Sequence, residues 1–214
     1  MSSELIEQLP SILPSGIEGS VVRMVGVTAA VADFPAPVGA LVEIEREGGA
    51  SLEAEVIGFT SELTLVYPYS DMQGVRHGNR VRLKRSKNWI RVGPELLGRV
   101  VDARGHCIDG RAQPWLPVRR PLDARPPAPM NRPRIDTPIS TGIRVIDGLL
   151  TCGKGQRMGI FAGSGVGKSV TLGMMARYTT ADVNVIALVG ERGREVVDFL
   201  EESLGETGRQ RSVV

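Results

Sequence analysis

One stretch constrains the fold of this chain more than any other: Gly-Ile-Phe-Ala-Gly-Ser-Gly-Val-Gly-Lys-Ser-Val, from Gly159 to Val170. An apolar run from Met158 to Phe161 opens it, and a pattern typical of an amphipathic helix continues to Tyr178. A buried strand, a glycine-rich loop and a helix, in that order, form a phosphate-binding P-loop. The chain is therefore predicted to contain an α/β domain with a parallel sheet.

Each residue type in this loop has a role in holding a phosphate. Glycines let backbone N–H groups approach an anion closely, and the helix that begins near Gly167 directs its positive dipole end at the same anion. Lys168 is expected to reach the β- and γ-phosphates, and the Ser169 hydroxyl is expected to ligate Mg²⁺. The predicted nucleotide-binding residues are Ala162, Gly163, Ser164, Gly165, Val166, Gly167, Lys168, Ser169 and Val170.

The loop departs from the strict pattern at its first position, where Ala162 replaces glycine. Alanine is small enough to pack there, although it would cost on the order of 1 kcal/mol if the position required a positive φ. A chance match in a glycine-rich loop is the alternative, and the flanking strand and helix patterns argue against it.

A second candidate lies at the end of the next apolar run, from Val183 to Val189, which is typical of a parallel strand covered on both faces. Glu191 follows it, at the carboxyl end of the strand, where parallel sheets bind ligands. Its carboxylate is predicted to orient a water that attacks the γ-phosphate, although a simple helix cap explains it equally well. Arg192 and Glu195 are candidate supporting residues, but a solvated helix face is the simpler interpretation of Arg194 and Glu195.

The first part of the chain carries short segments with apolar and polar alternation, separated by turn signals. Six such strands at this spacing predict a small antiparallel β-barrel, whose closure removes exposed edges. The expected strands are Ser20–Val25, Thr28–Ala32, Ala40–Glu45, Ser51–Phe59, Leu63–Tyr67 and Asn79–Leu83.

The expected domains are a barrel over residues 1–92 and an α/β domain over residues 93–214. Between the two patterned parts, eight of the chain's 14 prolines fall between Pro114 and Pro138, which excludes a helix or a central strand. We expect an extended segment packed over a domain surface, with a flexible linker as the alternative. The remaining expected elements are a helix at Glu4–Leu9, a hairpin from Leu97 that turns at Asp109–Gly110, a helix at Thr141–Leu150, a helix at Arg194–Leu204 and a strand from Arg211.

Charge and composition argue against several classes of partner. The net charge is +2 and aromatic residues make up 4%, which is poor material for binding nucleic acid. The basic stretch from Arg80 to Arg91 is interpreted as the outward face of a strand followed by a solvated loop, rather than as a nucleic-acid patch. Cys107 and Cys152 show no metal-binding spacing and read as reduced thiols of a cytoplasmic protein, and no apolar run reaches the length of a membrane span.

The loop from Ala162 to Val170, together with Gly-Glu-Arg-Gly-Arg-Glu-Val from Gly190, closely resembles the ATPases of flagellar and virulence type III secretion systems, relatives of the F-type ATP synthase β-subunit. The resemblance is weak over the barrel, clearer from Leu96 and most specific from Thr141 to Val214. It implies a RecA-like nucleotide domain after the barrel, ATP and Mg²⁺ as cofactors, Lys168 in its P-loop role and Glu191 as the catalytic carboxylate. Ala162 is ordinary in that family.

The resemblance also implies a hexameric ring that energises protein export by releasing chaperones and unfolding substrates. Its implied partners are stator and stalk proteins of the export apparatus, export chaperones and substrates, at a cytoplasmic location peripheral to the inner membrane. Members of that family are about twice this long, so the Walker B aspartate, the arginine finger and the C-terminal helical domain are expected beyond Val214. Because an arginine finger contributes roughly 10³–10⁵ in rate, these 214 residues alone are expected to hydrolyse ATP poorly.

Three alternatives stay open at this point. One is a subunit of an F-type rotary ATP synthase, because Ser169 is only a weak discriminator between the two branches. Another is a truncated, non-catalytic product that still docks on partners. A third, an RNA-translocating ring ATPase, is disfavoured by the scarcity of aromatic residues.

Overall fold

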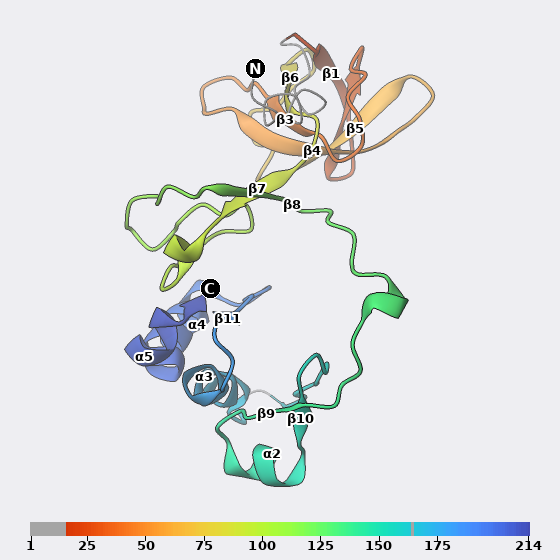
Figure 1. Ribbon diagram of the computed structural model, residues 1–214. Helices are drawn as coiled ribbons and strands as arrows, with labels where there is room; N and C mark the ends of the chain where they lie inside the picture. Colours follow the sequence, from red (N-terminus) through yellow and green to blue (C-terminus); the bar gives the residue numbers. More distant parts are fainter. Residues whose placement is uncertain (1–15, 164) are drawn as a thin grey trace. The chain divides into compact units, whose positions relative to one another are not determined.

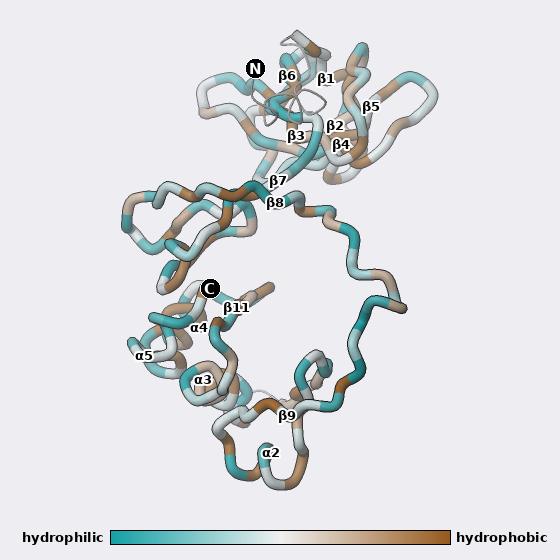
Figure 2. Tube along the Cα trace, in the orientation of Figure 1, coloured by the Kyte–Doolittle hydropathy of each residue, from teal (hydrophilic) through white to brown (hydrophobic). Residues whose placement is uncertain are grey.

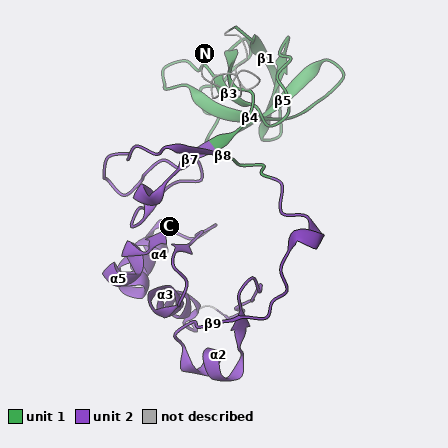
Figure 3. Cartoon of the chain, viewed as in Figure 1, with its two compact units in different colours: residues 1–89, 121–124 green, residues 90–120, 125–214 purple. Residues whose placement is uncertain are grey.

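The computed structural model describes residues 16–163 and 165–214, so the expected helix at Glu4–Leu9 and the loop residue Ser164 lie outside the described residues. The chain divides into two compact units (Figure 3). The first unit contains Met1–Trp89 and a short return segment, Pro121–Ala124. The second contains Ile90–Arg120 and Arg125–Val214.

The first unit is a closed antiparallel barrel with the strand order β1-β2-β5-β4-β3-β6 (Figure 1). This confirms the barrel that the alternating pattern predicts. The strand bounds differ from the expected ones by only a few residues: β1 Glu18–Val25, β2 Thr28–Ala32, β3 Leu41–Ile44, β4 Leu52–Phe59, β5 Leu63–Pro68 and β6 Arg80–Arg85.

Alternation along each strand explains why the barrel closes around an apolar core. In β4 the side chains of Leu52, Ala54 and Val56 are buried, while Glu53 and Glu55 between them are partly exposed. Because successive side chains of a strand point to opposite faces, this period of two fills the interior with apolar groups. The fully buried contributors from other strands include Val21, Val31, Val42, Ile44, Val66 and Val81.

Strand β6 carries its basic side chains outward, as the alternation predicts, and glutamates of neighbouring barrel strands pair with them. Exposed pairs of this kind stabilise a fold only slightly, but they neutralise the row of positive charge within the barrel itself. The pairs are Arg80 and Arg82 with Glu18, Arg82 with Glu45, and Lys84 with Glu43 and Glu53, at N–O distances of 2.9 to 3.6 Å.

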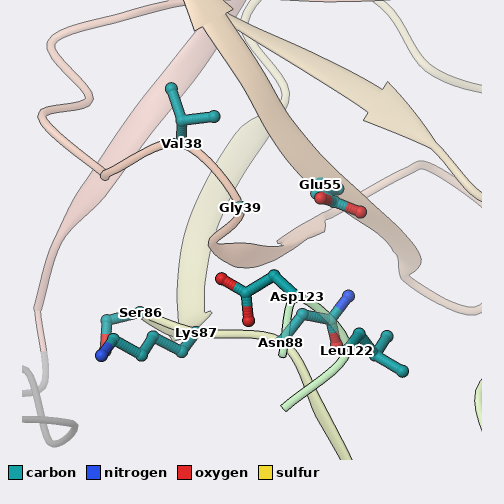
Figure 4. A pocket seen from close by; sticks show the side chains of 8 residues that line it. All are labelled: Val38, Gly39, Glu55, Ser86, Lys87, Asn88, Leu122 and Asp123. Atoms are coloured by element: carbon teal, nitrogen blue, oxygen red, sulfur yellow. The ribbon is translucent and has the colours of Figure 1, made fainter. Parts of the chain in front are cut away.

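The return segment Pro121–Ala124 contacts the barrel through Asn88. The Leu122 amide donates to the Asn88 carbonyl at 3.1 Å, and the Asn88 side-chain amide donates to the Tyr69 hydroxyl at 2.8 Å. Tyr69 in turn donates to Glu55 at 2.7 Å. A pocket of about 240 Å³ lies here (Figure 4), lined by Val38, Gly39, Glu55, Ser86, Lys87, Asn88, Leu122 and Asp123.

The second unit contains short strands and helices. Strand β7 (Trp89–Val92), which crosses from the first unit, pairs with β8 (Val118–Pro121), β9 with β10, and β11 in parallel with β12. A short 3₁₀ helix, η2 (Pro94–Leu96), follows β7. The elements after β8 are, in chain order, η3 Pro129–Asn131, β9 Pro138–Ile139, α2 Arg144–Leu149, β10 Cys152–Gly153, α3 Lys168–Tyr178, β11 Asn184–Val185, α4 Gly193–Asp198, the π-helical η4 Phe199–Leu204, α5 Gly205–Gln210 and β12 Ser212–Val213.

The structure confirms the helix after the P-loop, the short helix before it and the strand near the chain's last residues, as α3, α2 and β12. The helix expected at Arg194–Leu204 begins one residue earlier, widens into η4 and continues as α5. None of the helices among the described residues is long and apolar enough to cross a bilayer.

The expected strand at Met158–Phe161 is wrong, because these residues form no ladder and Phe161 is 96% exposed. A parallel strand needs a neighbour for its backbone groups, and no strand of the described residues pairs with this segment. The apolar run Val183–Val189 is covered on one face only: Ile186 and Leu188 pack on the helices, whereas Val185 and Val189 are more than four-fifths exposed.

Two further expectations are corrected in the proline-rich part. The segment is extended, and only part of it packs as expected: Leu116 is buried and the Leu122 amide donates to the Asn88 carbonyl, whereas residues 125–137 are exposed throughout. Figure 2 shows hydrophilic and hydrophobic residues mixed along it. The hairpin turns earlier than expected, between Asp102 and His106, where Gly105 donates to the Asp102 carbonyl and Val101 bridges to Cys107.

Candidate functional site

The P-loop helix α3 begins at Lys168, directly after Gly167, whose φ is +93°. Gly165 also has a positive φ, +77°. Such angles suit glycine and strain other residues, so the turn that presents the helix start depends on both glycines. No side chain of the described residues caps α3, which leaves its first amide groups available to an anion.

Close packing in the middle of α3 fixes its position. Gly173 lies against the backbone of Ser203 in η4, with no room for a side chain between them. Ala176 packs on Phe199 and Leu204 in a small apolar cluster. The Asn184 side chain, from β11, donates to the Ala176 carbonyl at 2.8 Å. These contacts hold the body of the helix while its first turn stays exposed.

The P-loop and the segment after β11 line one open cavity of about 650 Å³. The structure therefore brings together two stretches that the sequence separates by about 20 residues. Val166 is exposed and does not line the cavity. The lining residues are Ala162, Gly163, Gly165, Gly167, Lys168, Ser169, Val170, Gly190, Glu191, Arg192 and Glu195.

One acidic side chain in this cavity, Glu195, has a lowered pKa. A hydrogen bond with the Glu191 carboxyl lowers the pKa of Glu195, and Arg192 lowers that pKa further through an ion pair at 2.9 Å. Glu195 is exposed on α4, as a solvated face predicts, and it also lines the cavity. Arg194 is exposed and lies 4.0 Å from Asp198 along the helix, as a solvated face predicts.

The cavity provides oxygen ligands of the kind that Mg²⁺ prefers, the Ser169 hydroxyl and the Glu191 carboxylate. Among the described residues no group of three or more histidine, cysteine or acidic side chains has the geometry of a metal site.

Sequence reasoning missed two polar clusters of the second unit. Arg99 and Asp109, 8% and 1% exposed in their side chains, form a two-point ion pair at 2.7 and 2.8 Å. The Arg99 guanidinium holds the pKa of Asp109 far below its usual range. The second cluster surrounds Asp147 in α2. Neither has a short-range sequence signature, because Arg99 lies ten residues from Asp109 and the partners of Asp147 lie five to seven residues from it.

Comparisons with known proteins place this geometry in context. The profile of the ATP synthase alpha/beta family, nucleotide-binding domain, matches residues 142–214. The chain is 44% identical over 205 residues to the flagellum-specific ATP synthase of Pseudomonas aeruginosa, covering 92% of this chain and 45% of that protein. It is 43% identical over 215 residues to the type 3 secretion system ATPase of Xanthomonas euvesicatoria, covering all of this chain and 49% of that protein.

A similar solved structure is the assembled ATPase EscN, in complex with its central stalk EscO, from the type III secretion system of enteropathogenic E. coli. It superposes with a TM-score of 0.80 at 40% identity, over 91% of this chain and 47% of that one. The chain spans about half the length of the relatives that it matches.

Proposed function

This chain is a homologue of the flagellum-specific and type III secretion ATPases over the half of their length that it spans, and on that premise we propose that it binds and hydrolyses ATP to energise protein export. The observation that carries the proposal is the shared cavity of Lys168, Ser169 and Glu191. Hydrolysis of this kind depends mainly on positioning and on charge stabilisation, and these three side chains provide both.

Each proposed role follows from the chemistry of the side chain and its position. The Lys168 ammonium, in the first turn of α3, neutralises the β- and γ-phosphates next to the amides of the loop. The Glu191 carboxylate orients the attacking water and accepts its proton. Arg192 and Glu195 line the cavity beside Glu191 and form an ion pair with each other at 2.9 Å.

Mg²⁺ would be held by the Ser169 hydroxyl and the phosphates, and when bound it supplies positive charge that stabilises the leaving phosphate oxygens. The protein's own contribution is to place the hydroxyl at the start of a helix that packs closely on η4. The packing of Gly173 on η4 supports that contribution.

The proposal extends to the assembly. We propose a hexameric ring of the complete protein, acting with stator and stalk proteins, export chaperones and substrates at the cytoplasmic side of the inner membrane. The solved relative supports the first part, since it is an assembled ATPase with a central stalk. These 214 residues by themselves are proposed to bind nucleotide and to turn it over slowly.

Equilibrium binding of a fluorescent ATP analogue to the full chain, with Mg²⁺ present, tests the site directly. Lys168→Ala should raise Kd by about tenfold or more, since hydrogen bonds to charged groups contribute roughly 1.5–3 kcal/mol. Lys154→Ala, which removes an exposed lysine of the same unit, is the matched control and should leave Kd unchanged. Equal affinity of the Lys168→Ala and wild-type chains would refute the proposed site.

Glu191→Gln separates binding from chemistry. This variant keeps the size of the side chain but lacks the base, so it should bind the analogue normally and lose single-turnover hydrolysis. Unchanged hydrolysis by Glu191→Gln would assign the catalytic carboxylate elsewhere.

A further inference from the structure

Asp147 in α2 accepts four hydrogen bonds from the turn that precedes the helix. One carboxylate oxygen accepts from the Thr141 amide at 2.8 Å and from the Thr141 hydroxyl at 2.7 Å. The other oxygen accepts from the Ser140 hydroxyl at 2.7 Å and from the Gly142 amide at 3.1 Å. A carboxylate saturated in this way fixes the conformation of the turn from Ser140 to Gly142.

The same turn holds the residues that directly follow the P-loop helix. The Ser140 carbonyl accepts from the Thr180 amide at 3.0 Å and from the Thr179 hydroxyl at 2.9 Å, and the Ser140 amide donates to the Thr180 hydroxyl at 3.2 Å. Gly142 has a φ of +75° and lies against the Tyr178 backbone, where a side chain would have no room. Figure 1 shows β9, α2 and α3 meeting at this point.

These bonds close a loop of the chain around the nucleotide site. Starting from Ser140, the backbone passes through α2, β10, the P-loop and α3 before it reaches Thr180, which is 40 residues later and hydrogen-bonded to Ser140. The segment that enters the P-loop and the helix that leaves it therefore share one anchor. Helix α3 is 11 residues long, about 16 Å, so a rotation at its anchored end displaces Lys168 at the other.

We propose that Asp147 is a positioning residue for the nucleotide site, acting through the Ser140–Gly142 turn on the end of α3. The inference rests on the proposed function, because it assigns a remote anchor to the same ATP site. It differs from a helix cap, which would stabilise the six residues of α2 and leave nucleotide affinity unchanged.

The hydrogen bond from the Ser140 hydroxyl, together with those from Thr141 and Gly142, lowers the pKa of Asp147 to about 2. The carboxylate is therefore ionised at both pH 6 and pH 8. The hydrogen bonds that Asp147 accepts consequently do not change between these two pH values. Asp147→Asn should therefore change nucleotide affinity equally at pH 6 and pH 8.

The test compares Asp147→Asn with Asp182→Asn in the full chain. Both changes remove one negative charge, and Asp182 is an exposed residue close to the end of α3. The readouts are Kd for a fluorescent ATP analogue with Mg²⁺ and the thermal midpoint without nucleotide. Since a displaced Lys168 loses a charge-assisted hydrogen bond to the phosphates, Asp147→Asn should raise Kd by about ten- to a hundredfold, and Asp182→Asn should not.

A second pair of variants keeps the test valid if Asp147→Asn fails to fold. Thr179→Ala removes the hydroxyl that contacts the Ser140 carbonyl and should raise Kd, whereas Thr179→Ser retains the hydroxyl and should restore wild-type affinity. Wild-type Kd in the folded Asp147→Asn protein, with only a lower thermal midpoint, would overturn the inference. So would equal Kd values for the two Thr179 variants. Wild-type affinity in Lys168→Ala would instead overturn the proposed nucleotide site.

Discussion

Two helix glycines should respond with opposite sign to the same substitution. Gly173 lies in α3 and Gly148 in α2, and replacing either with alanine favours the helix by up to about 1 kcal/mol. At Gly148 the new methyl group would meet nothing among the described residues within 4 Å. Gly148→Ala should therefore raise the free energy of unfolding by about 0.5–1 kcal/mol.

At Gly173 the packing reverses the outcome. An added Cβ would lie 2.5 Å from the Ser203 carbonyl carbon, and closer still to its oxygen, so the backbone of η4 must move by about 1 Å. Overpacking of this kind costs typically 1–3 kcal/mol, and backbone cannot swing aside as a side chain can. After the gain in helix propensity, Gly173→Ala should lower the free energy of unfolding by about 1–2 kcal/mol.

Urea unfolding followed by circular dichroism at 222 nm measures this difference. All helices of the described residues belong to the second unit, so the helical signal reports on that unit. The control is Gly148→Ala, measured in the same buffer. A Gly173→Ala chain that is as stable as wild type, or more stable, would refute the argument that η4 contacts the P-loop helix too closely for a side chain.

Three further outcomes follow from buried and shielded charges. Asp109→Asn leaves the Arg99 guanidinium without its carboxylate partner in a site where Asp109 is 1% exposed. It should therefore lower the free energy of unfolding of the second unit, measured in urea, by about 3 kcal/mol or more. Asp102→Asn, at a carboxylate that is 28% exposed, should lower that free energy by less, and equal losses would contradict the argument. The Arg99 guanidinium lowers the pKa of Asp109 in the folded state, so the Asp109 carboxylate stabilises the fold fully above its unfolded pKa of about 4, and this stabilisation is lost progressively as pH falls below that value. The free energy of unfolding should therefore differ less between pH 6 and pH 3 in Asp109→Asn than in wild type. Burial, and then the Glu55 carboxylate, raise the pKa of Tyr69 to about 12; Tyr69→Phe should therefore remove the last phenolate transition seen at 295 nm, and a transition that persists would show that another tyrosine titrates there.

Sequence patterns predicted the parts of the fold that depend on neighbouring residues. Alternation in β4, from Leu52 to Val56, places apolar side chains on one face whatever the partner strand is. The start of α3 at Lys168 follows from the glycines before it. In both cases the local chain contains the physical cause, so the prediction needed no knowledge of distant residues.

The failures share a different cause, because they depend on partners that are remote in sequence. Met158–Phe161 has the composition of a buried strand, but a strand exists only where another one pairs with it. Asp147 looked like an ordinary helix residue, since its importance comes from contacts at Ser140 and, through it, Thr180. The remaining site assignments, including the roles of Lys168 and Ser169, stay predictions that the binding experiments address.

The brief return of the chain to the barrel at Pro121–Ala124 makes the two units inseparable by a single cut. Protease cleavage in the exposed stretch that follows, residues 125–137, would break the backbone but leave residues 90–120 on the barrel-bearing fragment. That fragment would still hold the other one, because Gly98, Arg99 and Val101 exchange backbone hydrogen bonds with Ser212 and Val214. The gene therefore cannot be divided at one codon into a barrel and a nucleotide domain, because at least one fragment would always contain residues that belong to the other unit.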